Sequence, residues 1–261
     1  MNNKNNTNKR VAILSTGSEI ISGDIQNTNS TYISKKLFQS EIICGEHLTT
    51  DDKEKNLKNG LNFLLKHNKA VIITGGLGPT EDDRTRFIVS DIINSDLIFD
   101  NNSLINIKKR LDLKNILVKE NNKKQCLFPK GSLIIENFNG TASGFIINFK
   151  INNQNKAIIA LPGPPSENKP MIDKIVIPYL LKSNFSYPHH HLRWTVQNLP
   201  ESDLAESLEP IAKKYNIEIA YRIHKPYCDV KIDLPKKTYT DQSIISDIKS
   251  SIYDIIKNHL K

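Results

Sequence analysis

The sequence has few of the residues that stabilise secreted or membrane-bound proteins. Its 261 residues include three cysteines, at positions 44, 126 and 228, which are far apart and odd in number. Their number and spacing fit neither a disulfide framework nor a metal site. We therefore expect reduced thiols, as in cytoplasmic proteins. No apolar run approaches the ~20 residues that cross a bilayer, so we expect no membrane contact. Residues 1–9, rich in Asn and Lys, lack the apolar stretch of a secretory signal and predict a disordered tail.

Aromatic residues are also scarce, with a single tryptophan in the chain. The formal net charge is +8, which could attract either nucleic acid or small anionic substrates. The lysines are scattered among many asparagines rather than gathered into a patch, and stacking side chains are few. We therefore do not expect specific nucleic-acid binding, and small anionic ligands are the favoured partners.

The most informative segment of the chain runs from Val71 to Thr85. An apolar β-branched run leads into a glycine turn, and two adjacent carboxylates, Asp82 and Asp83, precede an apolar-spaced segment. This pattern predicts a strand, a tight loop and a helix over residues 82–94. Glycines allow backbone N–H groups to approach a ligand, and a helix N-terminus favours anions. The predicted phosphate-binding residues are Gly75, Gly76, Gly78, Pro79 and Thr80.

The two acids would repel a bare phosphate, so we expect a divalent cation, Mg²⁺ or similar, between carboxylate and phosphate oxygens. Asp82 and Asp83 are the predicted metal ligands and catalytic residues. A purely structural role is the alternative, because Thr80 and Asp83 fit the spacing of a helix capping box. Capping explains Thr80 and one acid, but it does not explain three glycines and a proline in the loop.

Strands and helices alternate along the first two thirds of the chain. Strands are predicted at 11–14, 41–48, 70–74, 132–135, 144–149 and 157–161, and helices at 29–39, 51–67, 82–94, 101–115 and 171–181. Such alternation predicts an α/β fold with a doubly wound sheet between helical layers. Ligands in these folds bind beyond the carboxyl ends of the strands. The loops at 16–19, 49–52 and 75–80 all fall at that edge.

Several motifs, in order, resemble those of the CinA (competence-damage-inducible) family. The signature Gly-Gly-Leu-Gly-Pro-Thr-x-Asp-Asp-x-Thr occupies residues 75–85. The segments at 16–20, 23–29, 124–126, 140–145 and 161–167 are similar to further family motifs, and the resemblance covers residues 10–255. It implies a molybdopterin-binding-like α/β domain over residues 10–183. Fuller family members add a C-terminal nicotinamide mononucleotide deamidase domain, for which we expect no residues here.

The resemblance also implies further site residues, each with a structural alternative. Glu19 would hold a pterin or base edge, or be a solvated acid. Asn27 would contact substrate, or cap a helix, and the same two possibilities hold for Asp51. Thr141 would donate to a phosphate, or only form a turn. The loop residues Gly163, Ser166 and Glu167 would close the pocket, or be a structural turn.

Residues 183–191 are polar and predict a linker, within which three consecutive histidines would be solvated rather than bind metal. Beyond it the pattern predicts strand 192–197, helix 201–215, strands 217–222 and 228–234, and helix 241–260. This β-α-β-β-α order, over residues 190–261, resembles the KH-like domain of CinA proteins. It lacks the Gly-x-x-Gly loop with which KH domains clamp RNA.

The resemblance implies a metal-dependent nucleotide pyrophosphatase that converts ADP-ribose, or a similar dinucleotide, to AMP and ribose 5-phosphate. The residue pattern alone implies only a metal and a phosphate. One alternative is a molybdopterin-binding module without hydrolysis, acting in cofactor assembly or regulation. Another is a competence-linked factor associated with nucleic acid. The wider superfamily implies a homo-oligomer.

Overall fold

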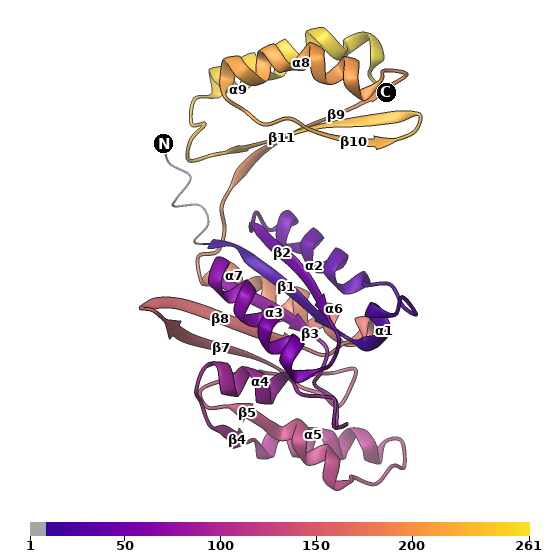
Figure 1. Cartoon of the computed structure of the whole chain (residues 1–261), viewed down its shortest axis with the longest axis vertical. Helices are drawn as coiled ribbons and strands as arrows, with labels where there is room; N and C mark the ends of the chain where they lie inside the picture. Colours follow the sequence, from indigo (N-terminus) through magenta and orange to yellow (C-terminus); the bar gives the residue numbers. More distant parts are fainter. Residues whose placement is uncertain (1–8) are drawn as a thin grey trace. The chain divides into compact units, whose positions relative to one another are not determined.

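The structure is a computed structural model that describes residues 9–261 (Figure 1). The predicted tail, apart from Lys9, lies outside the described residues. The chain divides into two compact units, with the boundary between Ser186 and Tyr187. That boundary lies inside the predicted linker, but the linker is shorter than predicted because the three histidines already belong to a strand. Within residues 9–261, no helix has the length and apolar content needed to span a membrane.

A six-stranded sheet forms the centre of the first unit (Figure 1). Four of its strands are parallel: β2 (Cys44–Thr50), β1 (Val11–Thr16), β3 (Ala70–Thr74) and β8 (Gln154–Leu161), in that order. Two more follow, β7 (Gly144–Ile151) and β6 (Leu133–Ile135), and each pairs antiparallel with its neighbour. The sheet is therefore mixed, and the doubly wound prediction describes only its parallel part.

The reversal between β7 and β8 is a tight hairpin. Asn152 and Asn153 have φ of 49° and 61°, the left-handed conformation that two-residue hairpins require and asparagine tolerates. The chain returns at once beside the strand it has just left, with Ile151 opposite Gln154. A parallel partner would have needed a crossover helix, for which two residues are too few.

Helices cover both faces of this sheet, because successive side chains of a strand point to opposite sides. One core contains Val11 and Ile13 of β1, packed with α2 (Thr28–Gln39) and with the continuous run α6, η4 and α7. That run comprises Pro165–Met171, the π-helical turn Ile172–Val176, and Ile177–Lys182. The second core contains Ala12 and Leu14, packed with α3 (Glu54–His67) and α4 (Thr85–Ile92). The predicted three-layer α/β/α arrangement is confirmed.

Several short elements of the first unit were not predicted. They include the helix α1 (Ser18–Ile21) and a two-stranded sheet of β4 (Leu97–Phe99) and β5 (Leu127–Pro129). Between these strands lie α5 (Asn101–Asp112), three residues shorter than predicted, and the 3₁₀ helix η3 (Glu120–Cys126). The helix predicted over 171–181 begins earlier, at Pro165, because proline fits the first turn of a helix.

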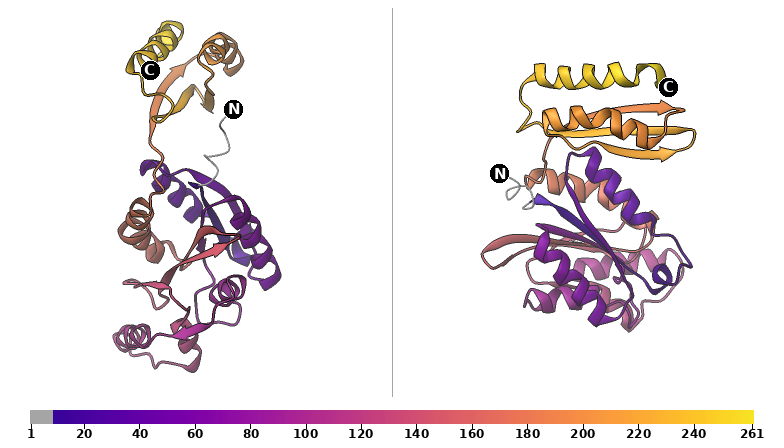
Figure 2. Two further views of the ribbon diagram at one scale, coloured as in Figure 1. Left: turned by 90° about the vertical axis from the view of Figure 1, so that its left-hand side faces the viewer. Right: turned by 45° about the horizontal axis from the view of Figure 1, so that its top comes forward.

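The second unit is a three-stranded antiparallel sheet with two helices on one face (Figure 2). Its elements are β9 (His189–Gln197), α8 (Glu201–Tyr215), β10 (Ala220–His224), β11 (Tyr227–Pro235), α9 (Gln242–Ile256) and η5 (Lys257–His259). The predicted β-α-β-β-α order is confirmed. β11 is the central strand, and every second residue from Cys228 to Leu234 is buried against the helices. β9 and β10 are therefore the edge strands.

Candidate functional site

A cavity of about 360 Å³ lies where the four parallel strands of the first unit end. Each strand contributes the loop that follows it. Thr16 ends β1 and is followed by Gly17 and Glu19, and Asp52 follows β2. Residues 75–79, 82 and 83 follow β3, and residues 162–164 follow β8. Gln125, Thr141, Ala142 and Glu167 complete the lining. The expectation that these loops meet at the carboxyl edge of the sheet is confirmed.

The glycine loop after β3 turns so tightly that side chains would not fit. Gly75 has φ of 107°, and a Cβ there would lie 2.5 Å from the carbonyl oxygen of Thr16. Gly76 has φ of 67°, and its Cβ would lie 2.2 Å from the hydroxyl of Thr85. The loop therefore needs glycine for its conformation and for its close contacts.

This loop leaves three consecutive backbone donors available. The N–H of Gly75 donates to the carbonyl of Leu161, and the N–H of Thr80 donates to Asp83. By contrast, the N–H groups of residues 76–78 have no hydrogen-bond partner in the described part of the chain. Successive unpaired N–H groups form a concave anion-binding site.

The helix after the loop begins later than predicted, at Thr85 rather than Asp82. Residues 81 and 82 form a turn, and the Asp83 carboxylate accepts hydrogen bonds from the N–H and hydroxyl of Thr80. Interaction with the Thr80 side chain and with its own backbone N–H holds the pKa of the Asp82 carboxyl below its ordinary value. Thr80 thus positions the acids and does not itself line the cavity. The capping box considered for Thr80 and Asp83 is not formed, because the N-cap of the helix is Arg84, without a side-chain cap hydrogen bond. The Thr80–Asp83 contact stabilises the turn before the helix instead, and both acids line the cavity.

A buried arginine that the sequence analysis missed supports the loop from below. Arg86 has no exposed surface, and its guanidinium donates to the carbonyls of Leu77 (2.8 Å) and Gly78 (3.4 Å). Burial lowers the pKa of Arg86 to about 10, although the negative charge of Asp83 opposes this shift. The side chain therefore remains charged at neutral pH beneath the three free N–H groups. Its sequence signal was weak, because an arginine in an amphipathic helix usually faces solvent.

Five carboxylates line the cavity: Glu19, Asp52, Asp82, Asp83 and Glu167. Three of them occupy space that a side chain on a neighbouring glycine would share. A Cβ at Gly17 would lie 2.7 Å from Glu19, one at Gly78 would lie 2.4 Å from Asp83, and one at Gly140 would lie 2.2 Å from Glu167. No lysine, arginine or histidine is among the lining residues that the structure describes. The cavity is thus strongly acidic around a floor of N–H donors.

The structure distinguishes two neighbouring acids after β2. Asp52, not singled out from the sequence, accepts hydrogen bonds from the hydroxyl of Thr16 (2.8 Å) and from the N–H of Ser18 (2.8 Å). It therefore fixes the loop after β1. The predicted Asp51 does not line the cavity. Its carboxylate accepts from Asn56 (2.8 Å) at the start of α3, and this hydrogen bond lowers its pKa. The helix cap considered for Asp51 is not observed, because the N-cap of α3 is Lys53, without a side-chain cap hydrogen bond. Asp51 stabilises the turn before the helix instead, where it also accepts from the N–H of Lys53 (3.3 Å).

Two later loops are joined to the cavity by buried amides. Gln125 donates to the hydroxyl of Thr141 (3.2 Å) and, at 3.5 Å, to the carbonyl of Leu77. Asn137 donates to Glu167 (2.7 Å), and its amide oxygen accepts from the N–H of Gly140. These contacts hold the 137–142 loop against the start of α6. Both amides were missed as functional candidates, because a lone Asn or Gln carries no recognisable spacing.

The remaining predicted residues, Asn27, Ser166 and Gly163, differ in their relation to the cavity. Asn27 caps α2 by accepting from the N–H of Ser30 (3.1 Å), which is its structural alternative. Ser166 is exposed, and its carbonyl accepts from Asn139. Gly163 lines the cavity, with its carbonyl held by Asn29 and Asn168. Arg84 forms an ion pair with Glu54 at 3.1 Å.

A divalent cation fits the chemistry of this donor set. No group of three or more His, Cys, Asp or Glu side chains within residues 9–261 is arranged as a complete metal site. Mg²⁺, however, is usually held by one or two carboxylates and completed by phosphate and water oxygens. Asp82 and Asp83 could supply such carboxylates beside the free N–H groups.

Comparison with known proteins identifies the first unit. Residues 12–182 match the family model described as "Probable molybdopterin binding domain". A "Putative competence-damage inducible protein" of Clostridium botulinum (strain Loch Maree / Type A3) is 43% identical over 77% of this chain and 48% of its own length. The chain therefore spans about half the length of such curated relatives.

Two further relatives extend the comparison. A "Putative competence-damage inducible protein" of Caldanaerobacter subterraneus subsp. tengcongensis is 33% identical over 96% of this chain and 60% of its own length, so that similarity includes the second unit. Among solved structures, the protein CinA of Thermoplasma acidophilum, described as of unknown function, superposes with a TM-score of 0.58 at 26% identity. It covers 69% of this chain and 99% of that one.

Proposed function

The chain belongs to the family of probable molybdopterin binding domains and is a CinA-family protein, and from that premise we propose that it is a divalent-metal-dependent nucleotide pyrophosphatase. Its substrate would be ADP-ribose or a similar dinucleotide, and its products AMP and ribose 5-phosphate. The observation that carries the proposal is the composition of the cavity. Within the described residues, the N–H groups of residues 76–78 have no hydrogen-bond partner and could bind an anion, and the cavity around them is lined by five carboxylates and no basic side chain.

That composition requires a cation if a pyrophosphate is to bind. Two unit charges about 4 Å apart interact by about 4 kcal/mol at the effective dielectric of a protein surface, so several carboxylates would repel a bare diphosphate. The N–H groups of residues 76–78 and the single positive charge of Arg86 would not offset the charge of five carboxylates. A divalent ion held by Asp82 and Asp83 would neutralise their two charges and offer a cationic centre to the phosphate oxygens. When bound, such an ion polarises the phosphoryl oxygens and lowers the pKa of a water molecule.

The residues of the chain then have separate roles. The loop N–H groups would bind a phosphoryl oxygen and stabilise the charge that develops there during hydrolysis. Arg86 keeps these groups in place through the carbonyls of Leu77 and Gly78. Thr141, with its hydroxyl held by Gln125, would donate to the substrate. Glu19 and Glu167 would contact its nucleoside or sugar portions.

The proposal is tested by incubating the purified full chain with ADP-ribose and Mg²⁺ and identifying the products by chromatography. We expect AMP and ribose 5-phosphate in equal amounts, and none when EDTA replaces the metal. Asp83→Asn is the informative variant, because the amide oxygen can still accept from Thr80 while the charge is removed. Loss of turnover with unchanged melting would support metal binding. Turnover near that of the wild type in a folded Asp83→Asn protein would exclude the role proposed for Asp83.

A second candidate is a molybdopterin-binding module that does not hydrolyse its ligand and serves cofactor assembly or regulation. It is supported by the family description and by the contacts of Asp83, which already stabilises the loop through Thr80. The same N–H groups would then hold the phosphate of the pterin. Binding of a pterin phosphate without turnover of any nucleotide diphosphate would favour this candidate.

The second unit and the assembly are further parts of the proposal. The β-α-β-β-α order supports a KH-like unit, but the unit contains no glycine and so no Gly-x-x-Gly loop. We therefore propose that the second unit binds no nucleic acid specifically. We also propose a homo-oligomeric assembly, as the resemblance to the wider superfamily implies. Sequence-selective binding of a short RNA at physiological salt would instead support the competence-linked alternative.

A further inference from the structure

Asn168, on α6, is a fully buried residue whose side-chain hydrogen bonds within residues 9–261 all go to one loop of the cavity. Its amide nitrogen donates to the carbonyl oxygens of Pro162 (3.2 Å) and Gly163 (3.2 Å), in the loop after β8. Its amide oxygen has no hydrogen-bond partner in the part of the chain that the structure describes. A buried acceptor without a partner lowers the stability of a fold, so stability alone does not explain an asparagine here.

Gly163 has the only N–H group in the segment 162–165, because the other three residues are prolines, which have none. Among the described residues this N–H has no hydrogen-bond partner. Gly163 lines the cavity, and a Cβ on it would lie 3.7 Å from the Cα of Gly75. A further backbone donor therefore lies beside the glycine loop, whose N–H groups at residues 76–78 are equally without partners in the described chain.

The hydrogen bonds of two asparagines fix the direction of this N–H. The peptide bond between Pro162 and Gly163 is trans, so its carbonyl and its N–H point in opposite directions. Asn168 holds that carbonyl on the side of α6, and the N–H of Gly163 is therefore turned away from the helix. Asn29 of α2 holds the next carbonyl, that of Gly163 itself, at 2.7 Å. With both carbonyls held, neither peptide unit can rotate without breaking a hydrogen bond.

We propose that Asn168 is a positioning residue, which directs the N–H of Gly163 toward the ligand so that backbone donors of two loops bind its phosphoryl oxygens. This inference rests on the anion site proposed above and adds a fourth N–H group to it. A donor that is fixed in place before the ligand binds stabilises developing negative charge without reorganisation. Without the side-chain amide of Asn168, the peptide between Pro162 and Gly163 can rotate, and this donor is lost while the glycine loop is unchanged.

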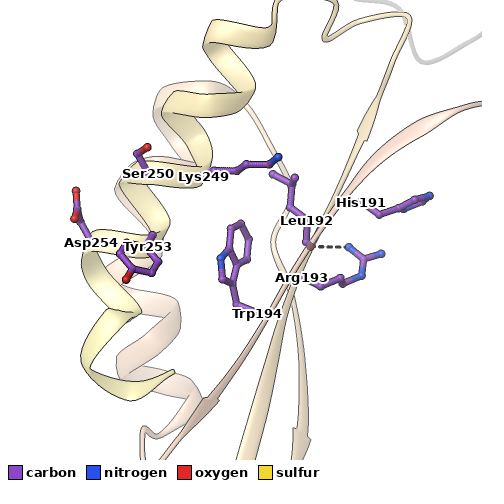
Figure 3. Close-up of a pocket in the computed structure, with 8 residues that line it drawn as sticks. All are labelled: His191, Leu192, Arg193, Trp194, Lys249, Ser250, Tyr253 and Asp254. Carbon is purple, nitrogen blue, oxygen red and sulfur yellow. Dashed lines mark hydrogen bonds between the residues drawn. The ribbon is translucent and has the colours of Figure 1, made fainter. Parts of the chain in front are cut away.

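A larger groove in the second unit is the reason to observe Gly163 itself. The groove has a volume of about 610 Å³ and lies between β9 and α9. Figure 3 shows Trp194 pointing into it from the strand and Lys249 reaching toward it from the helix. None of the described residues that line it has a buried polar atom without a partner. An anionic ligand could nevertheless be attracted to Lys249, so total binding does not report on a single loop.

The sequence allows the amide of Gly163 to be observed separately. Pro162–Gly163 is the only Pro-Gly pair of the chain, and Gly75–Gly76 is its only Gly-Gly pair. Labelling the carbonyl carbons of proline and glycine with ¹³C and the nitrogen of glycine with ¹⁵N therefore gives an HNCO spectrum with one signal from each loop. Both signals are followed while the full chain is titrated with a methylene-bridged, non-hydrolysable analogue of ADP-ribose in Mg²⁺. A hydrogen bond to a phosphate oxygen moves an amide proton downfield.

We expect both amide protons to move downfield in the wild type. In Asn168→Leu the Gly163 signal should respond little, the Gly76 signal should respond as in the wild type, and the affinity for the analogue should fall by roughly a factor of ten, the effect of one hydrogen bond to a charged group. The matched control is Asn68→Leu. Asn68 is also buried with an unpaired amide oxygen among the described residues, but it donates to the carbonyl of Leu64 (2.9 Å) at the other end of the sheet. This control should lower the melting temperature and leave both responses and the affinity unchanged.

The two signals separate failure of this inference from failure of the proposed function. A wild-type Gly163 signal that stays in place while the Gly76 signal moves would overturn the inference and leave the anion site of the glycine loop intact. If neither signal moves, the proposed anion site is wrong and the inference is wrong with it. A Gly163 signal that responds in Asn168→Leu as it does in the wild type would exclude the positioning role of Asn168.

Discussion

Asp51 and Asp52 are adjacent in the sequence, but only the Asp52 carboxylate lines the cavity, where it could contact a ligand. Both follow β2, and the sequence gives no basis for choosing between them except resemblance. In the structure Asp52 holds the loop after β1 and lines the cavity, whereas Asp51 binds Asn56 of α3. Asp52 is placed in the cavity by its contacts with Thr16 and Ser18, which lie more than thirty residues away in the sequence. A local sequence pattern cannot reveal such contacts.

This difference predicts opposite results for two conservative substitutions. Asp52→Asn should lower pyrophosphatase turnover by roughly 10–100-fold, the usual effect of disturbing residues that support a metal site. Asp51→Asn should leave turnover close to that of the wild type and cost at most about 1 kcal/mol of stability. Turnover and melting temperature, measured side by side, check both. Equal loss of turnover in the two variants would contradict the assignment of Asp52 to the cavity.

The glycine loop provides a second pair of matched variants. Gly76 and Gly131 both have positive φ, 67° and 85°, so alanine at either costs about 1–2 kcal/mol of backbone strain. Only at Gly76 would the new Cβ also collide with Thr85; at Gly131 the nearest atom of Ile147 lies 3.9 Å away. Gly76→Ala should therefore lose both stability and turnover, and Gly131→Ala only a modest amount of stability. A Gly76→Ala protein with normal turnover would show that the loop geometry is not needed.

At the scale of helices and strands, much of the fold was predictable. Val11–Leu14 and Ala70–Ile73 are continuous apolar runs, which is the pattern of strands buried on both faces. The three-residue strands β4 and β5 are too short to show any period. The start of α4 was predicted three residues early, because the turn at residues 81–82 depends on Thr80 and the Asp83 carboxylate. Acids at a helix start do not distinguish a first turn from the loop before it.

Helix α4 matters to the site chiefly through Arg86. Arg86→Met should lower the free energy of unfolding by about 1–3 kcal/mol, because it leaves buried carbonyls of the loop without their donor. It should also reduce turnover, since the N–H groups of residues 76–78 lose their support. Arg84→Met is the control, because it removes an exposed ion pair with Glu54 and a guanidinium contact with the Phe87 ring, and should cost about 0–1 kcal/mol. Denaturant unfolding and turnover compare the two; indistinguishable results would contradict the supporting role of Arg86.

At the scale of the whole molecule, every cavity residue lies in the first unit, before its boundary at Ser186. The boundary itself could be placed only approximately from sequence, because the polar residues 183–191 hide one core residue. Phe185 is 3% exposed and belongs to the core beside α7, and Ser186 pairs with Ile42. An isolated phenylalanine in a polar segment does not reveal that it is buried.

Two truncations test this division of the chain. A protein ending at Ser186 should fold and keep the pyrophosphatase turnover of the full chain. One ending at Ser183 loses Phe185 and should be less stable by about 3–5 kcal/mol, the usual cost of removing a buried aromatic side chain. Thermal unfolding of both fragments, with turnover measured on each, provides the comparison. Equal melting temperatures would contradict the placement of Phe185 in the core.

The central claim is that the acidic cavity accepts a diphosphate only together with a divalent cation. Calorimetric titration of the full chain with a methylene-bridged, non-hydrolysable analogue of ADP-ribose measures this directly, with and without Mg²⁺. The account predicts saturable binding at one site per chain in Mg²⁺, no detectable heat in EDTA, and loss of the Mg²⁺-dependent binding in Asp83→Asn. Binding of equal strength with and without the metal would contradict it.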